Sequence, residues 1–163
     1  MSLARRVDDL PRAFVLGLET GHGQVGDRDM KLAALRLDLV IVACAISAGI
    51  HGALVREHFQ EGTGAGLGFV AATVVLALLA VVLTRRPSQL ALVAAAAVLT
   101  GLIASYALVI ATGFPVLHPE AEAVDGLAVF TKAVEGAGLV LATSLLRRPS
   151  LAISLTQPKG TLT

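Results

Sequence analysis

The chain has 163 residues, of which 55% are hydrophobic and 15% are charged, and its formal net charge is +1. Soluble domains carry about 25% charged residues. The low charge and a mean hydropathy of +0.78 therefore exclude an ordinary soluble domain and predict an integral membrane protein. No basic face or aromatic platform accompanies this composition, so we expect no nucleic-acid partner.

The first 30 residues mix charged side chains with apolar ones at helical spacing. This pattern predicts an amphipathic helix lying on the inner surface of the membrane, kinked at Pro11. The glycine-rich run over residues 21–29 that follows predicts a flexible loop. Residues 1–30 are thus expected to form a cytoplasmic, amphipathic and flexible segment.

Four apolar segments of 19 to 23 residues follow, over residues 37–55, 64–83, 90–112 and 126–146. A helix needs about 20 apolar residues to cross the hydrocarbon layer of a bilayer, so each segment is long enough to span it. The sequence predicts an all-α integral membrane protein, with an up-down four-helix transmembrane bundle over residues 31–150. Residues 151–163 are expected to form a tail.

Lys and Arg concentrate before the first segment, between the second and third, and after the fourth. The other two connections are mostly acidic. Cytoplasmic loops of membrane proteins carry the excess of Lys and Arg, so we expect both termini in the cytoplasm and the acidic loops outside. The layout is similar to that of small four-helix membrane proteins of GC-rich bacteria, which predicts a multi-pass protein of the bacterial inner membrane.

The second and fourth segments end in the same four residues, Arg-Arg-Pro-Ser, at positions 85–88 and 147–150. His58 and His118 lie at a similar offset in the two expected outer loops. The pattern fits two repeated helical hairpins. It also fits two independent cytoplasmic helix stops, because Pro ends a helix and Arg anchors at lipid headgroups. The sequence leaves both interpretations open.

Lys132 and Glu135 lie inside the last apolar segment. A charge at that depth costs at least ~2.5–3.5 kcal/mol, so it is rarely retained without a partner or a role. On the first segment, His51 shares one helical face with Cys44, Ser47 and His58. The first and fourth helices of an up-down bundle are neighbours. We therefore predict an intramembrane polar site of His51, Lys132 and Glu135 in the outer half of the bundle.

A rim of acids and histidines is expected above this site, formed by Glu57, His58, Glu61, His118, Glu120 and Asp125. Imidazole and carboxylate together suit divalent metals, which makes His58 and His118 candidate ligands of a divalent metal cofactor. No recognised metal-binding motif accompanies them. Haem held by two histidines is not expected, because only His51 lies within a predicted helix.

These features favour a membrane protein that binds or helps to move a cation, a proton or a small ligand. Four short helices are few for such a role, so the lipid-embedded chain is expected to form a homo-oligomer or to join a partner membrane protein. Alternatively, Lys132 and Glu135 only neutralise each other at i,i+3 spacing, in a non-catalytic structural or accessory subunit of a larger complex. An enzyme is the least supported hypothesis, because Ser47 and His51 lack an oxyanion element.

Overall fold

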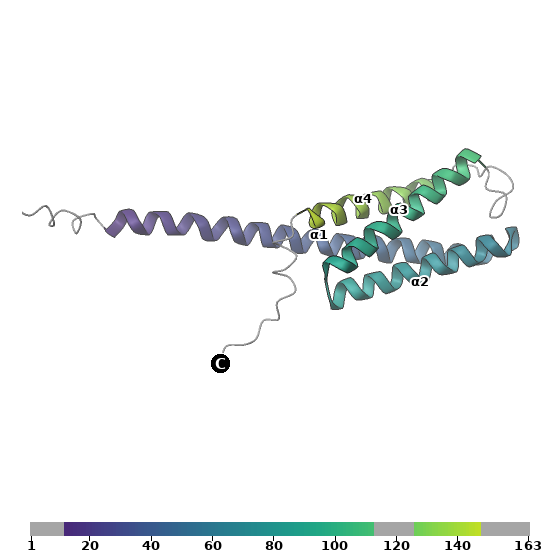
Figure 1. Ribbon diagram of the computed structural model, residues 1–163, viewed down its shortest axis with the longest axis horizontal. Helices are drawn as coiled ribbons and strands as arrows, with labels where there is room; N and C mark the ends of the chain where they lie inside the picture. Colours follow the sequence, from purple (N-terminus) through teal and green to yellow (C-terminus); the bar gives the residue numbers. More distant parts are fainter. Residues whose placement is uncertain (1–11, 113–125, 148–163) are drawn as a thin grey trace, which may run out of the picture. The chain divides into compact units, whose positions relative to one another are not determined.

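The fold was analysed in a computed structural model that describes residues 12–112 and 126–147, with side chains from residue 27 onward. The chain divides into two units, residues 1–33 and 34–163, and each is described by itself. The described residues form four helices (Figure 1). They are α1 (Arg12–Glu61), α2 (Thr63–Arg85), α3 (Gln89–Thr112) and α4 (Gly126–Leu146).

The last three helices confirm the predicted segments to within two residues at either end. The first prediction, residues 37–55, is too short, because α1 begins at Arg12 and ends at Glu61. The loop predicted over residues 21–29 is wrong, since α1 continues through it. Apolar patterning identifies only the part of a helix that is apolar. A helix continues through polar turns wherever other interactions outweigh the cost of residues such as glycine, about 1 kcal/mol each.

Within the first unit, residues 12–33 are helical and the described side chains are largely exposed. Lys31 donates to Asp27 one turn earlier over 2.7 Å. The pair has the favourable i,i+4 spacing, but both side chains are more than half exposed, at 75% and 57%. Such exposed pairs contribute only a few tenths of a kcal/mol, so this contact supports the helix weakly.

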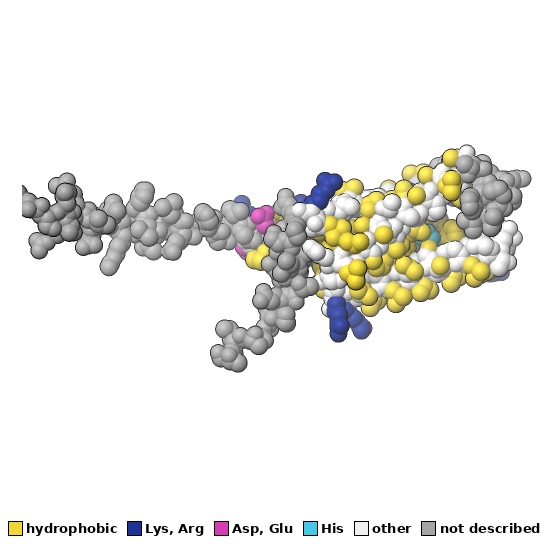
Figure 2. Space-filling view, viewed as in Figure 1, with side chains coloured by type: hydrophobic (Ala, Val, Ile, Leu, Met, Phe, Trp, Pro, Cys, Tyr) yellow, Lys and Arg dark blue, Asp and Glu magenta, His cyan; other side chains and the backbone are white. Residues whose placement is uncertain are grey.

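The second unit contains the bundle, meaning residues 34–61 of α1 together with α2, α3 and α4. Consecutive helices run in opposite directions (Figure 1). All four helices are long and apolar enough to cross a membrane, which confirms the predicted helix number and class and suggests a multi-pass membrane protein. Figure 2 shows hydrophobic side chains over the visible face of the bundle. The most exposed large apolar residues of the bundle are Leu35, Leu67, Leu78, Leu90, Val129, Phe130 and Val140.

The connection between α1 and α2 is a single residue, Gly62, where a loop over residues 56–63 was expected. The Gly62 N–H donates to the carbonyl of His58 over 3.0 Å. The Gly66 N–H donates to the carbonyl of Gly62 over 3.1 Å. The Phe59 ring occupies the space that a side chain at Gly66 would need. The last turn of α1 is therefore packed directly onto the first turn of α2, and the predicted loop is wrong.

The half of the bundle nearest the α2–α3 connection is closely packed. Leu76, Leu83 and Leu99 are fully buried there. A Cβ placed on Gly138 of α4 would lie 2.9 Å from the Cβ of Ala43 and 3.2 Å from Cδ1 of Leu99. Gly138 therefore allows α4 to approach both α1 and α3, the close approach that small residues permit in helical membrane proteins. The buried core of this half of the bundle is therefore apolar and includes one close contact between helices.

The packing at Gly138 predicts a position-specific cost for one methyl group. Gly138→Ala should lower the stability of the folded protein by about 1–3 kcal/mol, because the added methyl overpacks the contact with Ala43 and Leu99. Gly136→Ala is the matched control, since a Cβ there meets nothing within 4 Å. Thermal unfolding in detergent, followed by circular dichroism, checks both variants. Equal melting temperatures for the two would contradict the packing described.

Candidate functional site

Glu135 is a fully buried carboxylate with a partner for each oxygen. Ser47 of α1 donates its hydroxyl to Oε1 over 2.8 Å. Lys132, one turn earlier on α4, donates its ammonium to Oε2 over 2.7 Å. A buried charge is costly unless it is both paired and hydrogen-bonded. These two bonds meet that requirement and connect α1 to α4.

His51 lies beside this carboxylate and is oriented by its own helix. Its Nδ1 lies 2.9 Å from the Ser47 carbonyl, which can only accept, so Nδ1 carries a proton. The other ring nitrogen, Nε2, lies 3.9 Å from Oε1 of Glu135. When His51 is neutral and Glu135 is ionised, two acceptors therefore face each other. One added proton on either group turns this contact into a donor–acceptor pair.

Lys132 extends from α4 toward α3. Its Nζ lies 3.4 Å from the carbonyl of Leu102 and 5.2 Å from the centre of the Tyr106 ring. The latter distance is within the range of a cation–π contact. An ammonium has three donors, so Lys132 keeps the capacity for one acceptor beyond Glu135 and Leu102. Its side chain is 19% exposed, against 0% for Glu135.

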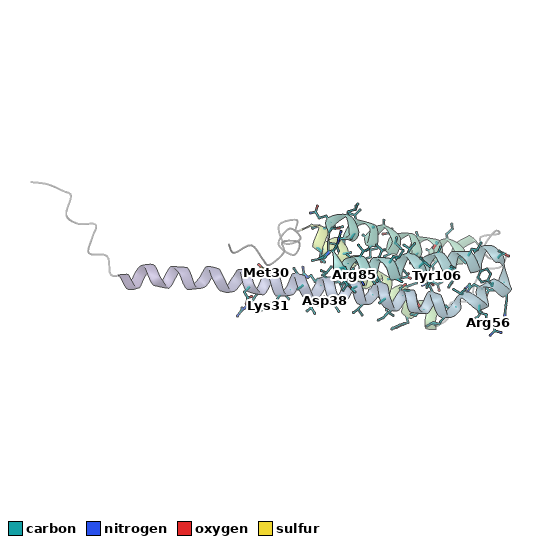
Figure 3. All side chains as sticks on the ribbon, turned by 90° about the horizontal axis from the view of Figure 1, so that it is seen from below. Met30, Lys31, Asp38, Arg56, Arg85 and Tyr106 are labelled. Carbon is teal, nitrogen blue, oxygen red and sulfur yellow. The ribbon has the colours of Figure 1, made fainter. Side chains whose placement is uncertain are left out.

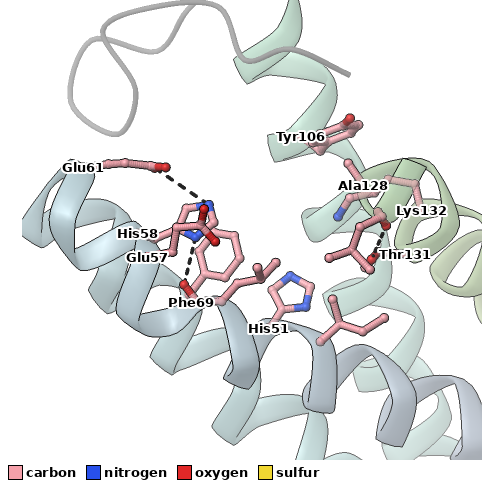
Figure 4. A pocket seen from close by; sticks show the side chains of 12 residues that line it. His51, Glu57, His58, Glu61, Phe69, Tyr106, Ala128, Thr131 and Lys132 are labelled. Carbon is pink, nitrogen blue, oxygen red and sulfur yellow. Dashed lines mark hydrogen bonds and ion pairs between the residues drawn. The ribbon is translucent and has the colours of Figure 1, made fainter. Parts of the chain in front are cut away.

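A cavity of about 140 Å³ lies next to these residues (Figure 4). It reaches from His51 and Lys132 to Glu57 and Glu61 near the end of α1. A buried water needs about 10–15 Å³ of such space and two to four polar partners. The cavity therefore has room for several water molecules among ionisable side chains.

His58 was expected in a loop, and that expectation is wrong, because α1 continues to Glu61. It lies in the last turns of α1, 5% exposed, with its ring stacked on Phe69 of α2 at 3.6 Å. Its Nδ1 donates to the Leu54 carbonyl over 3.0 Å, and its Nε2 lies 3.9 Å from Glu61. The His51 ring lies 5.1 Å from the same Phe69 ring. Phe69 thus contacts both imidazoles in the wall of the cavity.

The structure brings His51, Lys132 and Glu135 close together. That they form a functional site stays a prediction. Glu57, His58 and Glu61 line the same cavity. His118, Glu120 and Asp125 lie outside the described residues. In the part of the chain that the structure describes, no three His, Cys, Asp or Glu side chains are placed to hold a metal ion. The proposed pairing of His58 with His118 at a metal therefore stays a prediction.

Sequence reasoning missed two kinds of contributor. Ser47 was placed on the polar face of α1 but not in the site, because nothing local indicates a bond to a residue 88 positions away. Phe69, Tyr106 and Thr131 also line the cavity. They resemble ordinary packing residues in an apolar helix, so no sequence signal distinguishes them.

Comparison of the chain with models of known protein families, with curated proteins and with solved structures finds no match. The functional interpretation therefore depends on the geometry of the site.

The bond from Ser47 predicts a measurable loss of stability. Ser47→Ala should cost about 1.5–3 kcal/mol, the usual contribution of a hydrogen bond to a charged group. Ser144→Ala is the matched control, because the Ser144 hydroxyl donates only within its own helix, to the Leu141 carbonyl over 2.7 Å. Denaturant titration in mixed micelles checks this. A loss at Ser144 as large as that at Ser47 would contradict the assignment.

Proposed function

We propose that this chain is a multi-pass membrane protein that reversibly binds a proton at the buried pair of His51 and Glu135. The observation that carries the proposal is the fully buried Glu135 with Nε2 of His51 3.9 Å away, beside a polar cavity. The two groups present acceptors to each other, and a proton on either one supplies the donor that this contact lacks. Buried ionisable residues in membrane helices are typical of proton pathways.

A proton suits this site better than a metal cation. Lys132 lies 2.7 Å from Glu135 and already neutralises it. A divalent ion placed at Glu135 would therefore meet the repulsion of the ammonium at close range. A proton requires only one acceptor, and the Nε2 of neutral His51 supplies it.

The polar cavity gives the site an approach from one end of the bundle. Glu57 and Glu61 line the cavity toward the α1–α2 turn, which connects the buried pair with that end of the bundle. Toward the other end, Gly138 packs against Ala43 and Leu99 without space for a further methyl group. We therefore propose that protons exchange with the compartment next to the α1–α2 turn.

The distribution of basic residues supports an orientation. Figure 3 places Arg85 at one end of the bundle and Arg56 at the other. Arg86 follows Arg85 between α2 and α3, and Arg147 follows the last residue of α4. We propose that the helices cross the membrane with these arginines in the cytoplasm, so that both termini are cytoplasmic and the cavity opens outward. The interfacial N-terminal segment, the repeated hairpins and the bacterial inner membrane stay predictions.

The accessory-subunit alternative also has an observation in its favour. The 2.7 Å ion pair between Lys132 and Glu135 is what a self-neutralised pair requires. Gly101 and Gly136 have open space at their Cβ positions, which would admit a close-packed partner helix. In that case the wild-type protein would take up no proton at the pair. A homo-oligomer or a partner membrane protein fits either function.

The proton site predicts a change in the infrared spectrum on acidification. Reconstituted wild-type protein should show an infrared signal of protonation that requires both Glu135 and His51. The variants Glu135→Gln and His51→Phe should each remove this signal. Glu57→Gln, at an exposed wall residue, is the control that should retain it. The double variant Lys132→Met/Glu135→Gln avoids an unpaired buried ammonium and should also lose the signal. Full retention of the signal in Glu135→Gln and His51→Phe would refute the proposal.

The proposed orientation predicts opposite labelling of two exposed glutamines. In a Cys44→Ala background, Gln60→Cys should react in intact cells with a membrane-impermeant maleimide, whereas Gln89→Cys should react only after lysis. Gln60 ends α1 near the acidic turn, and Gln89 begins α3 next to the arginines. Labelling of Gln89→Cys alone would reverse the orientation. Equal labelling of both would exclude a four-span topology.

A further inference from the structure

A second and larger cavity, about 300 Å³, lies between α2 and α3. Its α2 wall consists mainly of small residues, Ala65, Gly68 and Ala72. Its α3 wall is formed by Leu102, Ser105, Tyr106 and Val109. The cavity shares His51, Phe69, Tyr106 and Lys132 with the polar cavity described above. It is therefore largely apolar, with polar groups concentrated where the two cavities meet.

The volume sets the size of molecule that fits. An apolar cavity of about 150 Å³ in another protein binds benzene. The present cavity of about 300 Å³ has room for a ring that carries several substituents. The side chains of Phe69 and Tyr106 supply aromatic walls, and aromatic rings pack favourably against other flat rings.

The polar end sets the chemistry. Lys132 donates to Glu135 and Leu102 and has donor capacity for one further acceptor. Because Glu135 already neutralises the ammonium, an anionic ligand would lose its hydration without gaining a net opposite charge. An uncharged ligand with an acceptor oxygen uses the donor without that loss.

We propose that this cavity binds an uncharged, flat ring compound that carries carbonyl oxygens, a chemistry found in membrane quinones. One carbonyl oxygen accepts a hydrogen bond from Lys132, and the ring packs against Phe69 and Tyr106. The site is distinct from the proton site, although both use Lys132.

The test uses three molecules with the same tetramethyl ring. Duroquinone carries two carbonyl oxygens, durene carries none, and tetramethylbenzoate is charged. Equilibrium dialysis against purified protein in detergent should show saturable binding of duroquinone. Binding of durene should be about tenfold weaker, the effect expected from losing one hydrogen bond of about 1.4 kcal/mol. Equal binding of durene, or tighter binding of the benzoate, would overturn the proposed chemistry.

Variants locate the site. Gly68→Leu should abolish duroquinone binding by filling the cavity, and Val109→Phe should do so from the opposite wall. Gly101→Leu is the control, because the same side chain is added where nothing lies within 4 Å. Unchanged binding in folded Gly68→Leu and Val109→Phe would overturn the location.

The two proposals fail separately. If duroquinone binding is absent but acid-induced protonation of the wild type persists, only the ring site is wrong. If Lys132→Met/Glu135→Gln loses protonation and also reduces duroquinone binding about tenfold, both stand. Undiminished duroquinone binding in this double variant would remove Lys132 from the ring site.

Discussion

The packing of this bundle and the chemistry of its candidate site both depend on the hydrogen bonds of one buried carboxylate, Glu135. Glu135 is fully buried, and its two oxygens accept from Ser47 and Lys132. Losing the bond from Lys132 would leave a buried charge unpaired, at a cost of about 3–5 kcal/mol, and losing the bond from Ser47 would cost about 1.5–3 kcal/mol. The bond to Ser47 therefore sets the register of α4 on α1. One turn beyond, Gly138 packs so closely against Ala43 that a methyl group added at Gly138 would overlap it.

That register divides the bundle into two halves of different character. On one side of Glu135, small and branched apolar residues pack closely and leave little space. On the other side, Phe69 of α2 and His51 of α1 border two cavities that meet at Lys132. The asymmetry matters for function because a titratable group changes state only if protons reach it. The structure places a polar cavity on one side of Glu135 and a close apolar contact at Gly138 on the other.

Lys132 belongs to both proposed sites, which makes them thermodynamically linked. A carbonyl oxygen that accepts from the donor that Glu135 leaves unused shares the ammonium with the carboxylate and weakens their pairing. Proton binding and ligand binding would then alter each other by the same factor, as linkage requires. Such a coupling needs no large movement of helices. The coupling requires only that the Lys132 ammonium donates both to Glu135 and to a bound ligand.

The sequence by itself determined the helix class, the number of apolar helices and the i,i+3 placement of Lys132 and Glu135, because hydropathy and spacing are local properties. The shared face of Ser47, His51 and His58 also followed from helical periodicity. Only the tertiary structure decided that α1 continues to Glu61, that His58 is buried against Phe69, and that Ser47 bonds Glu135. Polar turns and hydrogen bonds between distant helices depend on the residues that pack beside them. A local sequence pattern does not identify those residues. The two cavities depend on all four helices at once, so no segment alone could predict them.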